Sequence, residues 1–169
     1  DVGSTFSFTI KCKAGHDDRH DNPAHAVDFS GKKVLLVDDN PTNLLILQTQ
    51  LTKQHMVIQA MHSGQAAIDI LLAGEQFDLL ITDMQMPDMD GTTLGARIKE
   101  LRPDLPIILL SSIGDETKRQ HPGLFSSVLT KPVRQQALFE VIATILLQQN
   151  NAQKPPKKSL RNQDFANSY

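Results

Sequence analysis

The sequence has little of several features that mark particular classes of protein. Cys12 is the only cysteine among 169 residues, so no disulfide can form within the chain, which is compatible with a reducing compartment. No apolar run approaches the length needed to span a membrane. The net charge is −2, and the densest basic stretch, residues 154–161, is short and interrupted by two prolines. No basic face for nucleic acid is therefore expected, and the composition is that of a small intracellular module.

Three short segments place charged side chains directly after apolar runs of strand length. VLLVDDN contains Asp38 and Asp39, LLITDMQMPDMDG contains Asp83, and LTKPV contains Lys131. Parallel α/β sheets gather their ligand-binding groups at the carboxyl ends of the strands. We therefore expect the three acids and the lysine to form one site.

The charges of this expected site indicate its chemistry. Three carboxylates held close together repel one another, and the usual remedies are protonation of one of them or a bound cation. The nearby donors are all oxygens, with no His or Cys among them, which favours Mg²⁺ or Mn²⁺ over Zn²⁺. Mg²⁺ often binds through a few carboxylates together with phosphate oxygens, so the pattern predicts phosphoryl chemistry.

Strand-like and helix-like stretches alternate along the chain. Strands are predicted at residues 34–37, 56–60, 77–82, 107–110 and 125–130. Helices are predicted at residues 41–53, from a cap at Ser63 to about Gly74, around Leu94, and at residues 134–149. Their predicted buried residues are Leu44, Leu47, Leu51, Ala67, Ile70, Leu71, Leu94, Ile98, Leu101, Leu138, Val141, Ile142 and Ile145. This alternation predicts an α/β fold with a doubly wound, five-stranded parallel sheet covered on both faces.

The segments VLLVDDNPTN, LLITDMQMPDMDG, PIILLSS and LTKPV, taken in order, resemble the receiver domain of two-component signalling, in the form found in hybrid sensor histidine kinases. The resemblance covers residues 32–149 and implies a flavodoxin-like strand order of 2-1-3-4-5. It also implies a cytoplasmic domain, even where the parent kinase is anchored in a membrane.

The resemblance assigns a role to each site residue. Asp83 would be the phosphoacceptor, and Mg²⁺ would be held by Asp83 together with Asp38, Asp39 and the backbone carbonyl of Gln85. Ser111 would be the hydroxyl switch residue. Lys131 would pair with the phosphoryl group.

The residues themselves agree that Asp83 is the nucleophile. It is the single acid at its strand end, whereas the pair formed by Asp38 and Asp39 is better suited to a cation. The domain would then catalyse its own phosphorylation and dephosphorylation. As in the family, its partner would be a phosphohistidine on the kinase dimerisation domain or on a histidine phosphotransfer domain.

Other interpretations of the same residues remain open. Asp38 and Asp39 can also be helix-start residues before Pro41. The same fold can serve as a docking module that is never phosphorylated. Asp88 begins a DxDGT pattern typical of haloacid-dehalogenase-type phosphatases, although the predicted strand has already ended at Asp83. An EF-hand reading of this stretch fails, because Met86 and Arg97 would occupy ligand positions.

Two departures from the family pattern concern signal output. Val128 occupies the position where many receivers carry Tyr or Phe, so a standard aromatic switch is not expected. Residues 114–123 contain two glycines and a proline with little apolar periodicity, which predicts a short or irregular helix. The family also favours a cis peptide bond between Lys131 and Pro132.

The flanking segments predict a fragment of a larger kinase. Residues 1–12 resemble the closing strand of a histidine-kinase ATP-binding domain, and residues 13–31 read as a polar linker. Residues 150–169 are polar, and they are expected to be a tail or a linker to a further domain such as a second receiver.

Overall fold

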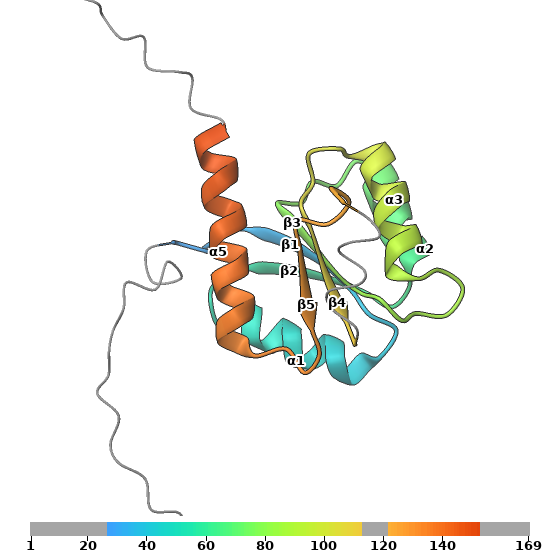
Figure 1. Cartoon of the computed structure of the whole chain (residues 1–169), viewed down its shortest axis with the longest axis horizontal. Helices are drawn as coiled ribbons and strands as arrows, with labels where there is room; N and C mark the ends of the chain where they lie inside the picture. The colour runs from blue at the N-terminus through green and yellow to red at the C-terminus, as the bar shows by residue number, and fades with distance from the viewer. Residues whose placement is uncertain (1–26, 113–121, 153–169) are drawn as a thin grey trace, which may run out of the picture.

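Five parallel strands form the centre of the computed structural model, with helices on both faces (Figure 1). The structure describes residues 27–112 and 122–152. The strands are β1 (Lys33–Val37), β2 (Val57–Met61), β3 (Leu79–Asp83), β4 (Ile107–Ser111) and β5 (Ser127–Thr130). The helices are α1 (Pro41–Thr52), α2 (Gly64–Leu72), α3 (Gly91–Leu101) and α5 (Gln135–Ala152). In the described part of the chain, none of the helices is long and apolar enough to cross a membrane.

The strand order is β2-β1-β3-β4-β5, and every neighbouring pair is parallel. The predicted fold class is therefore confirmed. In the register between β1 and β3, Val37 lies opposite Thr82. The residues that follow, Asp38 and Asp83, are thus brought side by side at the carboxyl edge of the sheet.

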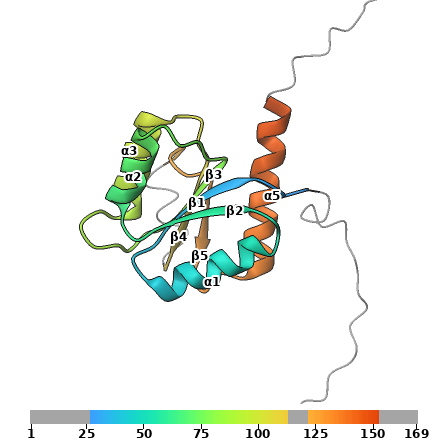
Figure 2. The same ribbon diagram turned by 180° about the vertical axis from the view of Figure 1, so that it is seen from behind.

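Two apolar layers enclose the sheet. The layer on one face joins α1 and α5 to strand residues such as Leu36 and Ile81. The layer on the other face joins α2 and α3 to residues such as Leu35 and Leu80, and Figure 2 shows the same two pairs of helices from behind. Because both faces are covered, β3 and β4 are buried along their whole length, as their continuous apolar runs predict.

The structure corrects three predicted core positions. Leu101 is 40% exposed at the last residue of α3, whose buried residues end at Ile98. In α2, Ile68 is buried and Ile70 only partly so, because the helix directs Ala67, Ile68 and Leu71 at the sheet and at α3. Val141 on α5 is likewise only partly buried.

Strands β3 and β5 begin two residues later than the sequence predicts, and several predicted segments lie outside the described residues. β3 begins at Leu79 and not at Phe77, and the Asp78 side chain just before it accepts hydrogen bonds from Lys32 and Lys33. β5 begins at Ser127, while Phe125 is buried ahead of it. Most of the stretch predicted to form an irregular helix, residues 113–121, lies outside the described residues. The predicted remnant at residues 1–12 and the polar tail beyond residue 152 lie outside them as well.

The chain enters the fold before β1, through a short turn that packs onto the core. Phe29 lies in the predicted linker but is only 4% exposed, and its ring centroid is 6.0 Å from that of Phe139 on α5. The turn is held by the Asp28 carboxylate, which accepts from the Ser30 amide, and by the Gly31 amide, which donates to the His55 carbonyl. At the same amino end of the sheet, the Gln149 side chain on α5 donates to the Asp78 carbonyl. The packed part of the chain therefore begins ahead of Gly31.

We predict that Phe29→Ala lowers the free energy of unfolding by about 3 kcal/mol, because it leaves a cavity against α5. The measurement is urea denaturation followed by circular dichroism. Leu45→Ala is the matched control, since Leu45 is 65% exposed on α1 and its truncation should cost less than about 0.5 kcal/mol. Equal stability of the two variants would show that the segment around Phe29 contributes nothing to the fold.

Candidate phosphoryl-transfer site

Three carboxylates converge at the carboxyl edge of the sheet. Asp38 and Asp39 directly follow β1, and Asp83 is the last residue of β3. One carboxylate oxygen from each of the three lies within 4.8 Å of the others. The sequence prediction that these acids form one group is therefore matched by their positions.

The three acids differ in exposure. Asp38 is 1% exposed and Asp83 is 5% exposed, whereas Asp39 lies on the surface. Asp39 thus marks the side on which the group opens to solvent. A ligand arriving from solution would meet this side first.

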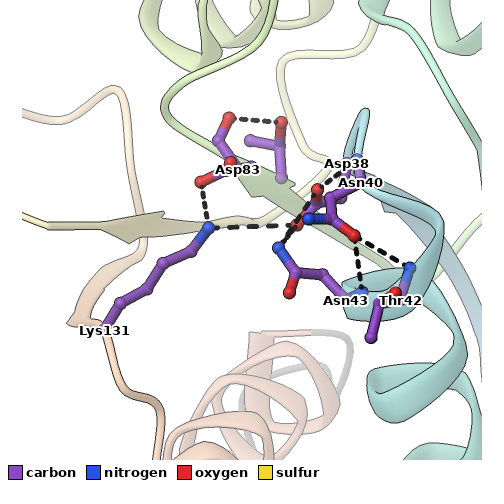
Figure 3. Close-up of polar contacts among 7 residues, drawn as sticks. Asp38, Asn40, Thr42, Asn43, Asp83 and Lys131 are labelled. Carbon is purple, nitrogen blue, oxygen red and sulfur yellow. Dashed lines mark hydrogen bonds and ion pairs between the residues drawn. The ribbon is translucent and has the colours of Figure 1, made fainter.

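Lys131 supplies the positive charge of the site (Figure 3). It follows β5 directly, and its peptide bond to Pro132 is cis, as the family pattern favours. Its Nζ lies 2.7 Å from Oδ1 of Asp83 and 3.9 Å from Oδ2 of Asp38. The lysine is therefore paired mainly with Asp83 and only weakly with Asp38.

Asp38 is held instead by neutral donors at the start of α1. Its Oδ1 accepts from the Asn40 amide at 2.8 Å, and the Asn43 side-chain nitrogen lies 3.1 Å from Oδ2. The N-cap of α1 is Asn40, whose side chain accepts from the backbone amides of Thr42 and Asn43. The structure therefore does not support the alternative in which the two aspartates only cap the helix.

The pKa of Asp38 is raised above its ordinary value. Burial is the largest cause, and the neighbouring charge of Asp83 adds to it. Hydrogen bonds from Asn40 and Asn43 and the charge of Lys131 act in the opposite direction but do not cancel the shift. Burial first, and the like charge of Asp83 second, therefore disfavour the ionised form of Asp38 despite the nearby lysine. Carboxylates at this spacing, with only oxygen donors, fit a hard divalent cation such as Mg²⁺.

Close packing behind Asp83 requires glycine at the start of α3. A Cβ on Gly91 would lie 2.4 Å from the backbone oxygen of Asp83 and 2.6 Å from Cδ1 of Leu109. The Gly91 amide also donates to the Met84 carbonyl at 3.0 Å. The requirement is steric, because Gly91 is not among the residues with positive φ. The lack of a side chain at Gly91 allows α3 to approach the strand end that carries Asp83.

The structure places the remaining predicted residues as follows. Ser111 is 3% exposed at the end of β4, and its backbone oxygen accepts from the Lys131 amide at 2.8 Å. Gln85 lies on the exposed loop two residues after Asp83. Asp88 is exposed on that loop with φ of 65°, and Asp90 is the N-cap of α3. The DxDGT stretch is thus a loop and a helix cap, and it does not follow a strand.

Sequence reasoning missed two residues that support the site, Asn43 and Gly91. Asn43 lies five residues after Asp38, in the first turn of a helix whose start was predicted at Pro41. That spacing alone could have indicated a side chain facing the strand end. For Gly91 the sequence carried no comparable signal, since the close approach depends on Leu109 of β4.

This chain is similar in sequence to one protein family and to known regulatory and sensor proteins. The model of one protein family, described as the response regulator receiver domain, matches residues 34–143. The chain is 38% identical over 118 residues to the transcriptional regulatory protein GlrR of Escherichia coli, covering 68% of this chain and 26% of GlrR. It is 31% identical over 156 residues to the E. coli sensor protein TorS, covering 90% of this chain and 17% of TorS. The chain thus spans about a quarter or less of the length of these relatives.

A solved structure shares the fold. The signal receiver domain of an HD domain-containing protein from Pseudomonas fluorescens Pf-5 superimposes with a TM-score of 0.65 at 31% sequence identity. The match covers 72% of this chain and 98% of that domain. The packed region described above therefore corresponds to nearly the whole of that domain.

We predict that Asp38→Asn stabilises the protein when no divalent cation is present. The folded-state pKa of Asp38 is raised, so stability is greatest below the ordinary pKa of aspartate and falls as the pH rises through the folded value. Asparagine keeps the Oδ1 acceptor for the Asn40 amide without the charge, and Lys131 keeps its contact with Asp83. The Asn43 side-chain amide can turn its own oxygen toward the new Nδ2, which replaces the bond that Asp38 Oδ2 accepted. Urea denaturation in EDTA from about pH 4 to about pH 7 should show this fall in the wild type and a smaller one in the variant. A variant less stable than the wild type at neutral pH would contradict the argument.

We also predict that Gly91→Ala lowers the free energy of unfolding by about 3 kcal/mol, because its Cβ must displace backbone or Leu109. Gly64→Ala is the matched control. Gly64 likewise begins a helix, but the closest contact of its Cβ would be the sulfur of the flexible Met89 side chain, at 3.0 Å, and the next, Leu94 Cδ1 and Met89 Cβ, would lie at an ordinary 3.5 Å. Chemical denaturation of both variants should therefore separate them by at least about 1 kcal/mol. Similar losses in the two would remove the steric explanation for Gly91.

Proposed function

Because the chain belongs to the response regulator receiver domain family, we propose that it accepts a phosphoryl group on Asp83 as part of a two-component phosphorelay. The observation that carries this proposal is the buried Asp83 carboxylate, which lies 2.7 Å from Lys131 and within an acidic group at one sheet edge. Asp83 is the acid to which the lysine lies closer, at 2.7 Å against 3.9 Å for Asp38. It is also the acid at the end of the fully buried central strand β3.

The proposed reaction moves one phosphoryl group between two side chains. A carboxylate oxygen of Asp83 forms a bond to phosphorus, and the bond from phosphorus to a histidine nitrogen of the donor breaks, with its electron pair staying on that nitrogen. Little further chemistry is asked of the protein, so its contribution is positioning and charge compensation. Loss of the group to water, or to a histidine of a transfer domain, would restore the Asp83 carboxylate.

The neighbouring residues would support this reaction in distinct ways. Lys131 would pair with phosphoryl oxygens, starting from its present contact with Asp83. The Ser111 hydroxyl, at the end of the adjacent strand β4, would donate a hydrogen bond to the phosphoryl group. Asp38, Asp39, Asp83 and the backbone carbonyl of Gln85 would hold Mg²⁺, with Mn²⁺ as a substitute. When bound, this ion neutralises negative charge on the phosphoryl oxygens.

We further propose that the domain works within a hybrid sensor histidine kinase. Sensor protein TorS is among its relatives, and its alignment extends beyond the residues that match the family model. The Pseudomonas protegens sensor histidine kinase GacS is another relative, at 32% identity over 127 residues. The donor would then be a phosphohistidine on the kinase, and the acceptor a histidine phosphotransfer domain.

We predict that intact-mass analysis after incubation with acetyl phosphate and Mg²⁺ will show one phosphoryl adduct in the wild type. The Asp83→Asn variant should show none, because an amide cannot act as the nucleophile. EDTA should abolish the adduct in the wild type, since the acidic group would then repel the incoming phosphate.

Asp88→Asn is the matched control for this experiment. Asp88 is exposed on the loop after β3 and lies outside the acidic group, so its replacement should leave the adduct unchanged. An adduct lost in Asp88→Asn but kept in Asp83→Asn would instead favour the phosphatase alternative. No adduct in any variant, either from acetyl phosphate or from a phosphorylated kinase domain, would favour the unphosphorylated docking module.

A further inference from the structure

We propose that Asn43 is a positioning residue for the cation site, holding the Asp38 carboxylate in place while leaving its negative charge uncompensated. This inference rests on the proposed function, because it concerns the divalent cation that the acidic group would hold. It adds a residue of α1 to a site otherwise built from strand ends. Asn43 can hold the carboxylate as a neutral donor, whereas the cationic Lys131 would compensate its charge.

The geometry places a single amide group against both oxygens of one carboxylate. Nδ2 of Asn43 lies 3.1 Å from Oδ2 of Asp38 and 3.4 Å from Oδ1. The Asn40 amide donates to Oδ1 at 2.8 Å. Figure 3 shows the Asn43 side chain reaching from the start of α1 toward the Asp38 carboxylate. Two neutral donors therefore fix the orientation of a side chain that is 1% exposed.

The backbone beneath Asn43 is itself fixed. Its amide donates to the Asn40 side chain at 3.4 Å, within the capped first turn of α1. The next residue, Leu44, is 3% exposed and packs in the core layer beneath α1 and α5. The helix thus cannot rotate without exposing this leucine. The backbone that carries the Asn43 side chain is accordingly held in place opposite Asp38.

The neutrality of the donor matters for the distribution of charge. Lys131 lies 3.9 Å from Asp38 but 2.7 Å from Asp83, so the lysine serves the phosphoacceptor. A cationic side chain at position 43 would compensate the Asp38 charge and compete with a metal ion. An amide satisfies the buried carboxylate by hydrogen bonding and leaves its full charge available to the ion. Without Asn43, only the Asn40 amide would hold Asp38, at Oδ1, and Oδ2 could then turn toward Lys131 and form a closer ion pair.

A purely structural role for Asn43 makes a different prediction. If its amide only satisfied a buried acceptor, its loss would lower stability and leave cation affinity as it was. The two roles are separated by measuring Mg²⁺ affinity and cation-free stability on the same variants. Asn43→Ala removes the donor, and Asn43→Leu removes it while keeping most of the side-chain volume. Gln48→Ala is the matched control, an exposed amide on α1 outside the site.

The experiment is a Mg²⁺ titration followed by the backbone amide signals of Asp39 and Asn40 in ¹H–¹⁵N NMR spectra, which also report whether each variant is folded. We expect the dissociation constant to rise about tenfold in both Asn43 variants and to stay unchanged in Gln48→Ala. Wild-type affinity in either folded Asn43 variant would overturn the inference while leaving the proposed function intact. Absence of Mg²⁺ binding in the wild type would overturn both.

Discussion

The mutual approach of Asp38, Asp39 and Asp83 is the constraint on which the rest of the site depends. Their carboxylate oxygens lie within 4.8 Å of one another, and two of the three side chains are buried. Such an arrangement is unfavourable by itself, because burial and like charge both oppose ionisation. It is maintained by a lysine on one side, by neutral donors from α1 on the other, and by a sheet too well packed to let the strand ends separate.

The sheet order makes this approach unavoidable once the core has formed. β1 and β3 are neighbours, and their register sets Val37 opposite Thr82, so the residues that follow must adjoin. A slip of one residue would move every side chain of the slipped strand into the opposite apolar layer, where it would not fit the existing packing. The cost of placing the acids together is therefore offset by the apolar burial of strands β1, β3 and β4. Stability and chemistry are linked through the same few residues.

The sequence was sufficient to predict the strands, their order in the sheet and the charged residues at their carboxyl ends. Each of these follows from a local pattern, an apolar run followed by a charge, or from the family resemblance that those patterns carry. The errors arose where a side chain's neighbours come from distant parts of the chain. Leu101 continues the helical periodicity but is exposed at the last residue of its helix, and Phe29 looks like part of a linker until α5 is placed beside it. Gly91 gains its meaning only from Leu109 on the neighbouring strand.

The segment around Phe29 and the end of α5 share one side of the domain. Phe29 packs on α5 ahead of β1, and Gln149 near the end of that helix bonds to Asp78, just before β3 begins. Both lie at the amino edge of the sheet, whereas the acids lie at the carboxyl edge (Figure 1). The chain thus enters β1 and leaves α5 on the side of the sheet remote from Asp83. A domain with this layout can be joined in series to other domains without its connections crowding the carboxylates of Asp38, Asp39 and Asp83.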